Sequence, residues 1–414
     1  MSDTRFWHGF ADMHAVRQRE MVIARAEGST VWDRDGRQYL DSTGGLWYAD
    51  AGFGRAEIGA AVAEQLSRVH AYSSFGPYVL DATLQLAERV ASIAPLPDAK
   101  VFFTSGGSEA IDTAAKLVRR YWDVVGRPEK QIIVAREFSY HGMAAYGTSL
   151  AGIAPNREGY GGSLIPTTRF VAPFDLDAIA DLFAREGEQI AAFIGEPVIG
   201  AGGVYPPPDG FWPAVADLCR QYDILLIADE VITGFGRTGR MFGVERYGYT
   251  PDLLVFAKGI TSGYQPLGGV IVGPRVQEPF WERGGNPFRH GYTYTGHGGA
   301  MAAGMANLDI FEREGLVSRV AEMEPAFDRI MRTLEDAPRV TAVRTVGSAC
   351  AVDVDVPPPV LEKVVAAGWD HGVLTRTLRG KALHISPTFV VTEAELEGIV
   401  SGLRAALTDV AATL

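Results

Sequence analysis

Residues 224–259 have the sequence ILLIADEVITGFGRTGRMFGVERYGYTPDLLVFAKG, in which two short apolar runs are followed at once by charged side chains. The runs, 224–228 and 253–257, have the length and composition of strands buried on both faces. Asp229 and Glu230 follow the first run, and Lys258 follows the second. This stretch therefore predicts a buried sheet. Because ligands bind at the carboxyl ends of parallel strands, it also predicts that a site lies at that edge of the sheet.

Similar apolar runs flank this stretch and alternate with helical patterns between about residues 100 and 290. Further strands are expected at 101–103, 131–135, 191–196 and 269–272, with helices such as 109–122 and 212–221 between them. Strands that alternate with helices predict parallel βαβ units. We therefore expect an α/β fold with a mostly parallel sheet that helices cover.

The two ends of the chain have patterns of their own. Near the N-terminus, residues 29–41 predict a hairpin, and two helical patterns follow it. Towards the C-terminus, a long helix is expected over 299–314, and alternating helices and strands after it predict a small α+β domain. The helices of these terminal parts are expected at 56–69, 82–93, 316–335, 358–371 and 393–411, and the strands at 340–346, 349–354 and 382–385.

Composition excludes several classes of partner. Acidic side chains outnumber basic ones by 50 to 38, a formal charge of −12, and no basic run offers a nucleic-acid or anionic membrane surface. No stretch approaches the ~20 apolar residues of a membrane span. Cys219 and Cys350 are too few for a disulfide framework or a zinc site. We expect buried inert thiols, no metal and a cytoplasmic location.

A third strand end adds a candidate anion site. The run 101–103 is followed by Thr-Ser-Gly-Gly-Ser-Glu-Ala (104–110), a Gly/Ser turn that leads into a helix. Free backbone N–H groups, a hydroxyl and the positive end of the helix would together bind a phosphate. Taken alone, the turn is equally an ordinary N-cap, and it has neither a dinucleotide-binding glycine pattern nor a Walker lysine.

The carboxylates and the lysine also have two interpretations each. Asp229-Glu230 would form a cap or salt bridge, or would face a cationic group of a ligand, since an unpaired buried carboxylate is costly. Lys258 would lie on the surface, or would supply the amine of a Schiff base. A phosphate site, a buried carboxylate and a strand-end lysine together match one cofactor, pyridoxal 5′-phosphate, which needs all three.

Six sequence blocks extend this match over nearly the whole chain, from Trp7-His8 to about Glu395. They resemble those of the class III (omega) aminotransferases, which are fold-type-I pyridoxal-phosphate enzymes. The blocks are FTSGGSEAIDTAAK (103–116), SYHG (139–142), GEPVIGAGG (195–203), ADEVITGFGRTG (228–239), FAKGITSGYQPLGG (256–269) and HGYTYTGH (290–297).

The resemblance implies a large domain with a mostly parallel seven-stranded sheet and a smaller α+β domain formed by both termini. We accordingly expect an N-terminal segment, 1–50, that joins the small domain. The large cofactor-binding domain is expected over 51–300 and the rest of the small domain over 301–414.

The resemblance also implies catalytic roles. Lys258 would hold the cofactor as a Schiff base and would move a proton during the reaction. Asp229 would pair with the pyridinium nitrogen, while Val231 and Tyr140 would lie on the two faces of the ring. His141 would lie near the ring or would be an ordinary core histidine, and Glu230 would be structural.

Phosphate binding is the next implied role. Gly107 and Ser108 would hold the phosphate within the subunit. Thr293 would reach the phosphate of the neighbouring subunit, so the active site would belong to a homodimer or a tetramer. The usual Asn-Ser-Gly-Ser of this turn is Ser-Gly-Gly-Ser here (105–108), which favours Ser108 over Ser105.

The substrate side of the site differs between members of the class. Enzymes for ornithine, 4-aminobutyrate or dialkylglycines carry a fixed arginine where this chain has His384. Instead, GVLTR (372–376) resembles the amine and beta-alanine:pyruvate transaminases, in which a mobile arginine, Arg376 here, binds the acceptor carboxylate. Arg379 is the alternative, and a solvated arginine on a loop is the plainer interpretation.

Aromatic side chains in the N-terminal segments either line the substrate pocket or belong to the core. An aromatic wall would suit an uncharged or aryl-alkyl amine, and Trp47 is the best candidate for it. The aromatic residues concerned are Trp7, Phe10, Trp47, Tyr48, Phe75 and Tyr78.

We thus expect ping-pong transamination from an amine or omega-amino acid to a keto acid such as pyruvate. A racemase, aminomutase or decarboxylase on the same scaffold is the alternative, and the missing arginine at His384 argues against the decarboxylase. A non-catalytic binding protein is the third interpretation.

Overall fold

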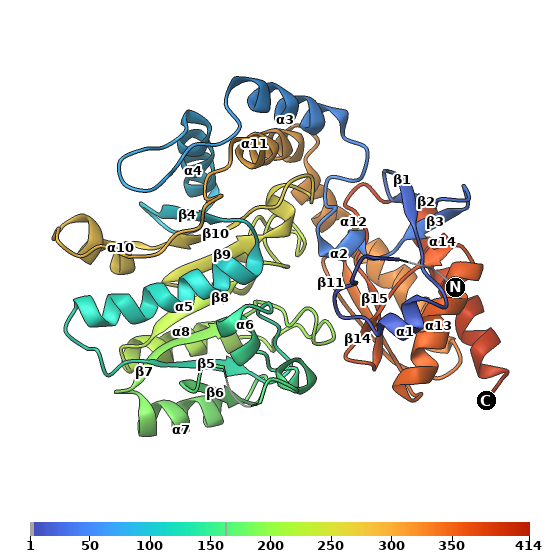
Figure 1. Cartoon of the computed structure of the whole chain (residues 1–414). Coiled ribbons are helices and arrows are strands. Elements are labelled where there is room, and N and C mark those ends of the chain that lie inside the picture. The colour runs from blue at the N-terminus through green and yellow to red at the C-terminus, as the bar shows by residue number, and fades with distance from the viewer. Residues whose placement is uncertain (1–3, 162–163) are drawn as a thin grey trace.

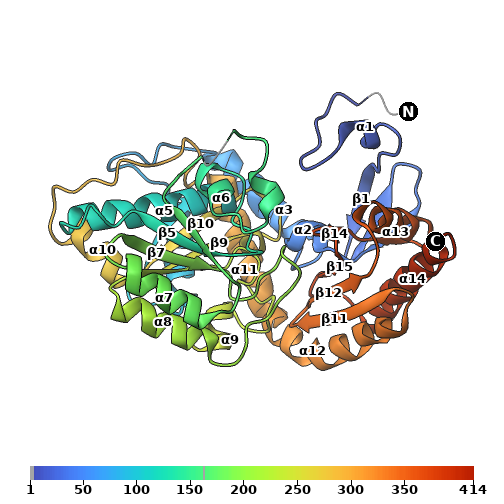
Figure 2. The same cartoon turned by 90° about the horizontal axis from the view of Figure 1, so that it is seen from below.

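The computed structural model describes residues 4–161 and 164–414. They form a large and a small lobe, and the small lobe combines the first and the last parts of the chain (Figure 1). Turned by 90°, the same two lobes lie side by side with loops between them (Figure 2). No helix within the described ranges is long and apolar enough to cross a membrane.

A seven-stranded sheet forms the centre of the large lobe, in the order β4-β10-β9-β8-β7-β5-β6. Neighbouring strands are parallel except at β10, which is antiparallel to both β4 and β9. The predicted mostly parallel sheet is therefore confirmed. The strands are β4 Lys100–Thr104, β5 Ile132–Arg136, β6 Thr168–Val171, β7 Ile190–Gly195, β8 Leu225–Asp229, β9 Leu253–Ala257 and β10 Gly268–Val272.

The antiparallel strand β10 brings the ends of β4 and β9 together. Gly268, its first residue, pairs with Thr104 on one side and with Ala257 on the other. A Cβ atom on Gly268 would lie 2.7 Å from the carbonyl carbon of Gly106, so only glycine fits between the strand and the turn. The turn after Thr104 and the lysine after Ala257 thus lie at one edge of the sheet.

Helices cover both faces of this sheet, because alternate residues of each buried strand point to opposite faces. One face packs against α5 and α6, with α10 beside α5. The other packs against α7, α8 and α11, and α3 and α4 pack on α11. These helices are α3 Ala56–Arg68, α4 Asp81–Ile93, α5 Gly107–Val124, α6 Ala145–Ser149, α7 Leu176–Glu186, α8 Phe211–Gln221, α10 Pro274–Trp281 and α11 Gly298–Arg313.

The small lobe contains two four-stranded sheets, β1-β2-β3-β13 and β11-β12-β15-β14. Strand β3 from the N-terminal part pairs in parallel with β13 from the C-terminal part, Leu40 opposite Val373. This pairing joins the two termini. The strands are β1 Ile23–Glu27, β2 Thr30–Asp33, β3 Gln38–Asp41, β11 Val340–Val346, β12 Ala349–Val354, β13 Val373–Leu374, β14 Thr377–Leu378 and β15 Ala382–Ile385.

Three long helices, α12, α13 and α14, form one hydrophobic core with these sheets. The bounds of these helices are α12 Leu316–Arg332, α13 Pro358–Asp370 and α14 Glu393–Ala411. The remaining short helices are α1 Met13–Val16, α2 Gly44–Trp47 and α9 Gly243–Tyr247, and 3₁₀ turns lie at Ala154–Arg157, Lys258–Ile260 and Thr333–Asp336.

Most predicted elements are present within a few residues of their expected bounds, but β1, β6, β13 and β14 were missed. Strand β1 is largely exposed, and β13 and β14 have two residues each, so neither a hydrophobic alternation nor sufficient length marks them. The domain boundaries at 50 and 300 stay a prediction. Helix α11 crosses the second of them and packs on α3 and α4.

Candidate functional site

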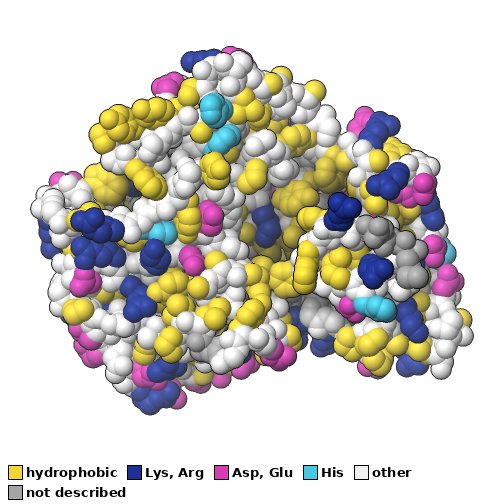
Figure 3. All heavy atoms as spheres, viewed as in Figure 1, with side chains coloured by type: hydrophobic (Ala, Val, Ile, Leu, Met, Phe, Trp, Pro, Cys, Tyr) yellow, Lys and Arg dark blue, Asp and Glu magenta, His cyan; other side chains and the backbone are white. Residues whose placement is uncertain are grey.

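A cavity of about 1000 Å³ lies at the carboxyl edge of the central sheet, between the two lobes. In the space-filling view the molecule is hollowed there, and hydrophobic side chains gather in the hollow (Figure 3). The structure brings together all but one of the predicted site residues. The predicted residues that line the cavity are Trp47, Gly107, Ser108, Tyr140, Asp229, Val231, Lys258 and Arg376.

Lys258 begins a 3₁₀ turn directly after β9 and has a left-handed backbone, φ +51°. This conformation is uncommon for a residue with a side chain and points to a functional constraint. Burial lowers the pKa of Lys258 to about 8, although Asp229 opposes this shift; Arg376 adds to it. At pH 7 about a tenth of the amine is therefore neutral and nucleophilic, far more than for an ordinary lysine.

Asp229, the last residue of β8, is held from below by a histidine. Its Oδ2 atom lies 2.6 Å from Nδ1 of His141, and its Oδ1 accepts the Val231 N–H at 3.1 Å. Both side chains are buried, and Nε2 of His141 has no partner among the described residues. The carboxylate is thus fixed at the cavity floor, where it would face a cationic ring nitrogen.

The neighbouring Glu230 is engaged by hydrogen bonds within the protein, in keeping with the structural role that the family resemblance implies. Its buried carboxylate accepts the N–H groups of Gly243 and Val244 at 2.9 and 2.8 Å, where α9 begins, and the hydroxyl of Thr233. Burial raises the pKa of Glu230 to about 7. Because the side chain is occupied by these donors, it is not part of the cavity lining.

The Gly/Ser turn places the start of helix α5 at one end of the cavity. Helix α5 begins at Gly107 without a side-chain cap, so its first N–H groups are free of helical partners. The Oγ of Ser108 accepts the Met143 N–H at 3.2 Å and lines the cavity, whereas Ser105 does not line it. A Cβ on Gly107 would lie 3.1 Å from Cγ1 of Val231, so this glycine keeps the space open.

One residue at the site escaped the sequence analysis. Glu196 follows β7, is buried, and accepts the N–H groups of Gly200 at 3.2 Å and Tyr140 at 3.4 Å. Burial raises the pKa of Glu196 to about 7, against the effect of the nearby His141. The strand-end rule that singled out Asp229 would have found it, since Glu196 follows the next strand of the sheet.

Two arginines line the cavity from the small lobe. Arg376 precedes β14 and has no carboxylate partner within the described ranges; burial lowers its pKa. Its charge is felt at Lys258. Arg379 follows β14, and its guanidinium lies 3.7 Å from the ring centre of Phe138. Arg376 is therefore the arginine near the lysine, and Arg379 is held against the opposite lobe.

Two of the six aromatic residues considered from the sequence line the cavity, Trp47 and Phe10. Trp47 lines the cavity, buried and stacked on His384 with 3.9 Å between ring centres, and Phe10 contacts Tyr140 edge-on at 6.4 Å. The other four aromatic residues do not line this chain's cavity. These are Trp7, Tyr48, Phe75 and Tyr78.

Thr293 also lies outside the cavity. It is exposed in a turn, and the preceding His290 anchors this segment to α5 through Thr113 Oγ1 and Lys116 Nζ, both at 2.8 Å. A single chain therefore does not bring Thr293 to the phosphate end of its own site.

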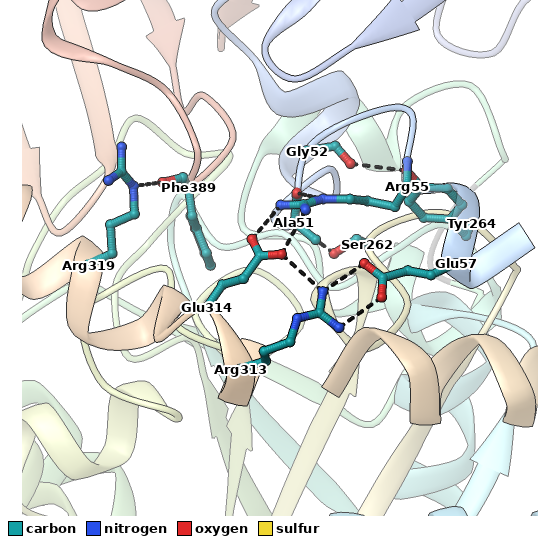
Figure 4. A network of polar contacts seen from close by, with 10 residues as sticks. All are labelled: Ala51, Gly52, Arg55, Glu57, Ser262, Tyr264, Arg313, Glu314, Arg319 and Phe389. Carbon is teal, nitrogen blue, oxygen red and sulfur yellow. Dashed lines mark hydrogen bonds and ion pairs between the residues drawn. The ribbon is translucent and has the colours of Figure 1, made fainter. Parts of the chain in front are cut away.

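Polar contacts hold the segment after Trp47 against the loop after Lys258 (Figure 4). The backbone N–H of Arg55 donates to the Tyr264 hydroxyl at 2.6 Å. The Arg55 guanidinium forms a bidentate pair with Glu314, with both N···O distances 2.8 Å. These contacts join three parts of the chain that are distant in sequence.

Comparisons with known proteins agree with this geometry. Residues 13–407 match the family Aminotransferase class-III. The beta-alanine–pyruvate aminotransferase of Pseudomonas aeruginosa is 36% identical over 432 residues, which cover 98% of this chain and 96% of that protein.

Solved structures agree as well. An (S)-enantioselective omega-transaminase from Thermomicrobium roseum is 38% identical with a TM-score of 0.94, covering 97% of this chain and 96% of that one. An amine transaminase from an uncultivated Pseudomonas species, in its pyridoxal-phosphate-bound form, is 34% identical with a TM-score of 0.94 and 99% coverage of both chains.

This chain belongs to the class-III aminotransferases. It has the fold-type-I arrangement and is a pyridoxal-phosphate-dependent aminotransferase, as predicted; a racemase, aminomutase or decarboxylase is not favoured. The described residues fit the cofactor, because a buried amine, a fixed carboxylate and an uncapped helix N-terminus converge on one cavity.

Proposed function

We propose that this enzyme transfers an amino group from an amine or omega-amino acid to a keto acid such as pyruvate. The observation that carries the proposal is the convergence of Lys258, Asp229 and the start of α5 on one cavity that Arg376 also lines. The amine transaminase and beta-alanine–pyruvate aminotransferase relatives support this substrate class.

Bound pyridoxal 5′-phosphate would supply an aldehyde for the amino group and a ring that withdraws electrons. Gly107 and Ser108 would hold its phosphate through backbone N–H groups and a hydroxyl. Val231 and Tyr140 would enclose the ring from its two faces. These side chains would orient the cofactor and exclude water from it.

Lys258 would be the covalent anchor and the base of the reaction. Its lowered pKa favours the neutral amine, which would take up the proton from the substrate Cα and later release it. Asp229 would keep the ring nitrogen protonated, and His141 would hold the carboxylate in place through the 2.6 Å contact.

Arg376 would bind the carboxylate of the keto acid. A permanently fixed, unpaired guanidinium would be costly when an uncharged amine fills the pocket, so we propose that Arg376 moves out towards water in that half-reaction. Trp47, stacked on His384, would form the apolar wall for the amine side chain.

The active site would be complete only in a homodimer, or in a tetramer built from it. Thr293 is exposed and away from its own cavity, which supports a role at the phosphate of the neighbouring subunit. The cytoplasmic location expected from the sequence stays a prediction.

Visible absorbance and a donor panel test the proposal. The purified protein should show the visible absorbance band of a bound pyridoxal chromophore. This band should bleach when a primary amine is added and return when pyruvate is added. Pyruvate consumption with a series of aryl-alkyl amines and omega-amino acids then defines the donor. A protein that binds the cofactor but shows neither change would refute the proposal.

A further inference from the structure

We propose that Arg379 forms a second carboxylate subsite, so that keto acids with two carboxylates serve as amino acceptors. Arg376 would hold the carboxylate next to the keto group, and Arg379 the distal one. The inference rests on the proposed transaminase function and extends it to a class of acceptor. It is carried by the backbone, the packing and the missing partners of Arg379.

The backbone at Arg379 is unusual for this residue type. The N–H of Lys381 donates to the carbonyl of Leu378 at 3.0 Å and closes a tight turn. The two central residues, Arg379 and Gly380, have φ values of +51° and +64°. This is the φ pattern of a type I′ turn, which favours Asn or Gly at both positions. An arginine at the first position is strained, and such strain accompanies functional sites.

The packing of Arg379 places its side chain at the wall of the cavity. Its guanidinium carbon lies 3.7 Å from the ring centre of Phe138, a residue that follows β5 in the large lobe. Both side chains line the cavity that Arg376 and Lys258 line. The ring holds the guanidinium in place without neutralising it, because a cation over an aromatic face keeps its charge.

Among the described residues, no carboxylate pairs with Arg379. Within residues 4–161 and 164–414, its guanidinium packs on the Phe138 ring, and its Nη1 atom is buried without a hydrogen-bond partner. Acidic side chains outnumber basic ones by 50 to 38 in this chain, so partners are plentiful elsewhere. Lys381, two residues on, lies 3.4 Å from Asp353. The unpaired donors of Arg379 therefore suit a carboxylate that arrives with a ligand.

The reaction balances without a further reagent. The amine donor leaves as an aldehyde or ketone, and the dicarboxylic keto acid leaves as the corresponding amino acid with both carboxylates intact. Arg379 takes no part in proton transfer. It contributes only to binding, so its removal should act on kcat/KM for the longer acceptor.

Arg379→Asn is the informative variant, because asparagine suits the turn and lacks the guanidinium. We expect kcat/KM for 2-oxoglutarate, relative to that for pyruvate, to fall about 10- to 100-fold, the loss of one charge-assisted pair. The thermal midpoint should not fall, since the substitution relieves backbone strain. Arg157→Ala is the matched control: Arg157 also lines the cavity and stacks on a phenylalanine, Phe170, at 4.1 Å. It should keep the ratio of the two acceptors.

Binding of glutarate, an unreactive dicarboxylate, gives a second readout. Titrated into the holoenzyme, glutarate should bind more tightly than butyrate, and Arg379→Asn should remove the difference. The inference is overturned if the wild type uses 2-oxoglutarate less than about one hundredth as well as pyruvate, or if Arg379→Asn lowers both acceptors equally. It is also overturned if Arg157→Ala gives the same selective loss. A protein without any amine:pyruvate turnover that still binds glutarate through Arg379 would refute the proposed function instead.

Discussion

His141 Nδ1 lies 2.6 Å from Asp229 Oδ2, and both side chains are buried below the cavity that Lys258 lines. The two residues are 88 positions apart and come from the loop after β5 and the end of β8. The contact leaves the other carboxylate oxygen near the cavity, held by the Val231 N–H. The Asp229 carboxylate, which would act on the cofactor ring, is therefore oriented by His141, a residue distant from it in the sequence.

Asp229→Asn should lower kcat by about 10²-fold or more, because an amide does not stabilise a protonated ring nitrogen. His141→Leu should cost less, about tenfold, since the carboxylate remains but loses its orientation. Steady-state rates with a saturating amine and pyruvate measure both. If the histidine variant loses as much as the aspartate variant, His141 does more than position the carboxylate.

Lys258→Ala should abolish turnover while the protein remains folded and keeps its circular dichroism spectrum. Borohydride reduction of the wild-type holoenzyme should attach the cofactor to the peptide that contains Lys258, as peptide mass spectrometry would show. Lys130, which is also buried but bonds backbone carbonyls away from the site, should carry no label. Label on any lysine other than Lys258 contradicts the assignment.

Arg376→Ala should act unequally on the two half-reactions. We expect KM for pyruvate to rise by the equivalent of about 2–3 kcal/mol. The rate at which an uncharged amine bleaches the absorbance band of the cofactor should stay near that of the wild type. Stopped-flow absorbance measures each half-reaction separately. Equal losses in both would show that Arg376 is not a mobile carboxylate ligand.

Thr293 gives a test of the assembly. If it reaches the neighbouring phosphate, Thr293→Ala should weaken cofactor binding by about tenfold and leave the sedimentation coefficient unchanged. Equilibrium dialysis of the cofactor and analytical ultracentrifugation provide the two measurements. A fully active monomer in the ultracentrifuge would remove the proposed role.

The lowered pKa of Lys258 predicts a pH dependence of stability in the cofactor-free protein. Since burial lowers this pKa from 10.5 to about 8, the unfolded state binds more protons between these values. Stability should therefore rise with pH through this window, and the cost of the buried charge is fully present below pH 8. Cofactor-free Lys258→Met should be more stable than the wild type at pH 7, by about 1–3 kcal/mol, with a smaller difference at pH 10. Urea unfolding at the two pH values measures it; a constant difference would contradict the pKa shift.

The apolar runs of the chain were enough to predict most strands of the central sheet, because a strand buried on both faces needs a continuous apolar sequence. The site residues after those runs could be predicted in the same way, since ligands bind at the carboxyl ends of the strands in this architecture. Lys258, Asp229 and the turn before Ser108 were found in this way, and the structure places all three at one cavity.

The antiparallel placement of β10, the contact of His141 with Asp229 and the absence of four of the six aromatic residues from the cavity lining depended on tertiary packing. Local patterns specify which residues form an element and which face is buried. They do not specify which distant elements pack beside one another. That packing depends on the register of Gly268 between its two neighbouring strands and on the fit of loops from both lobes. The sequence thus determined the elements and the chemical groups of this aminotransferase, and the packing of its two lobes decided which of those groups meet.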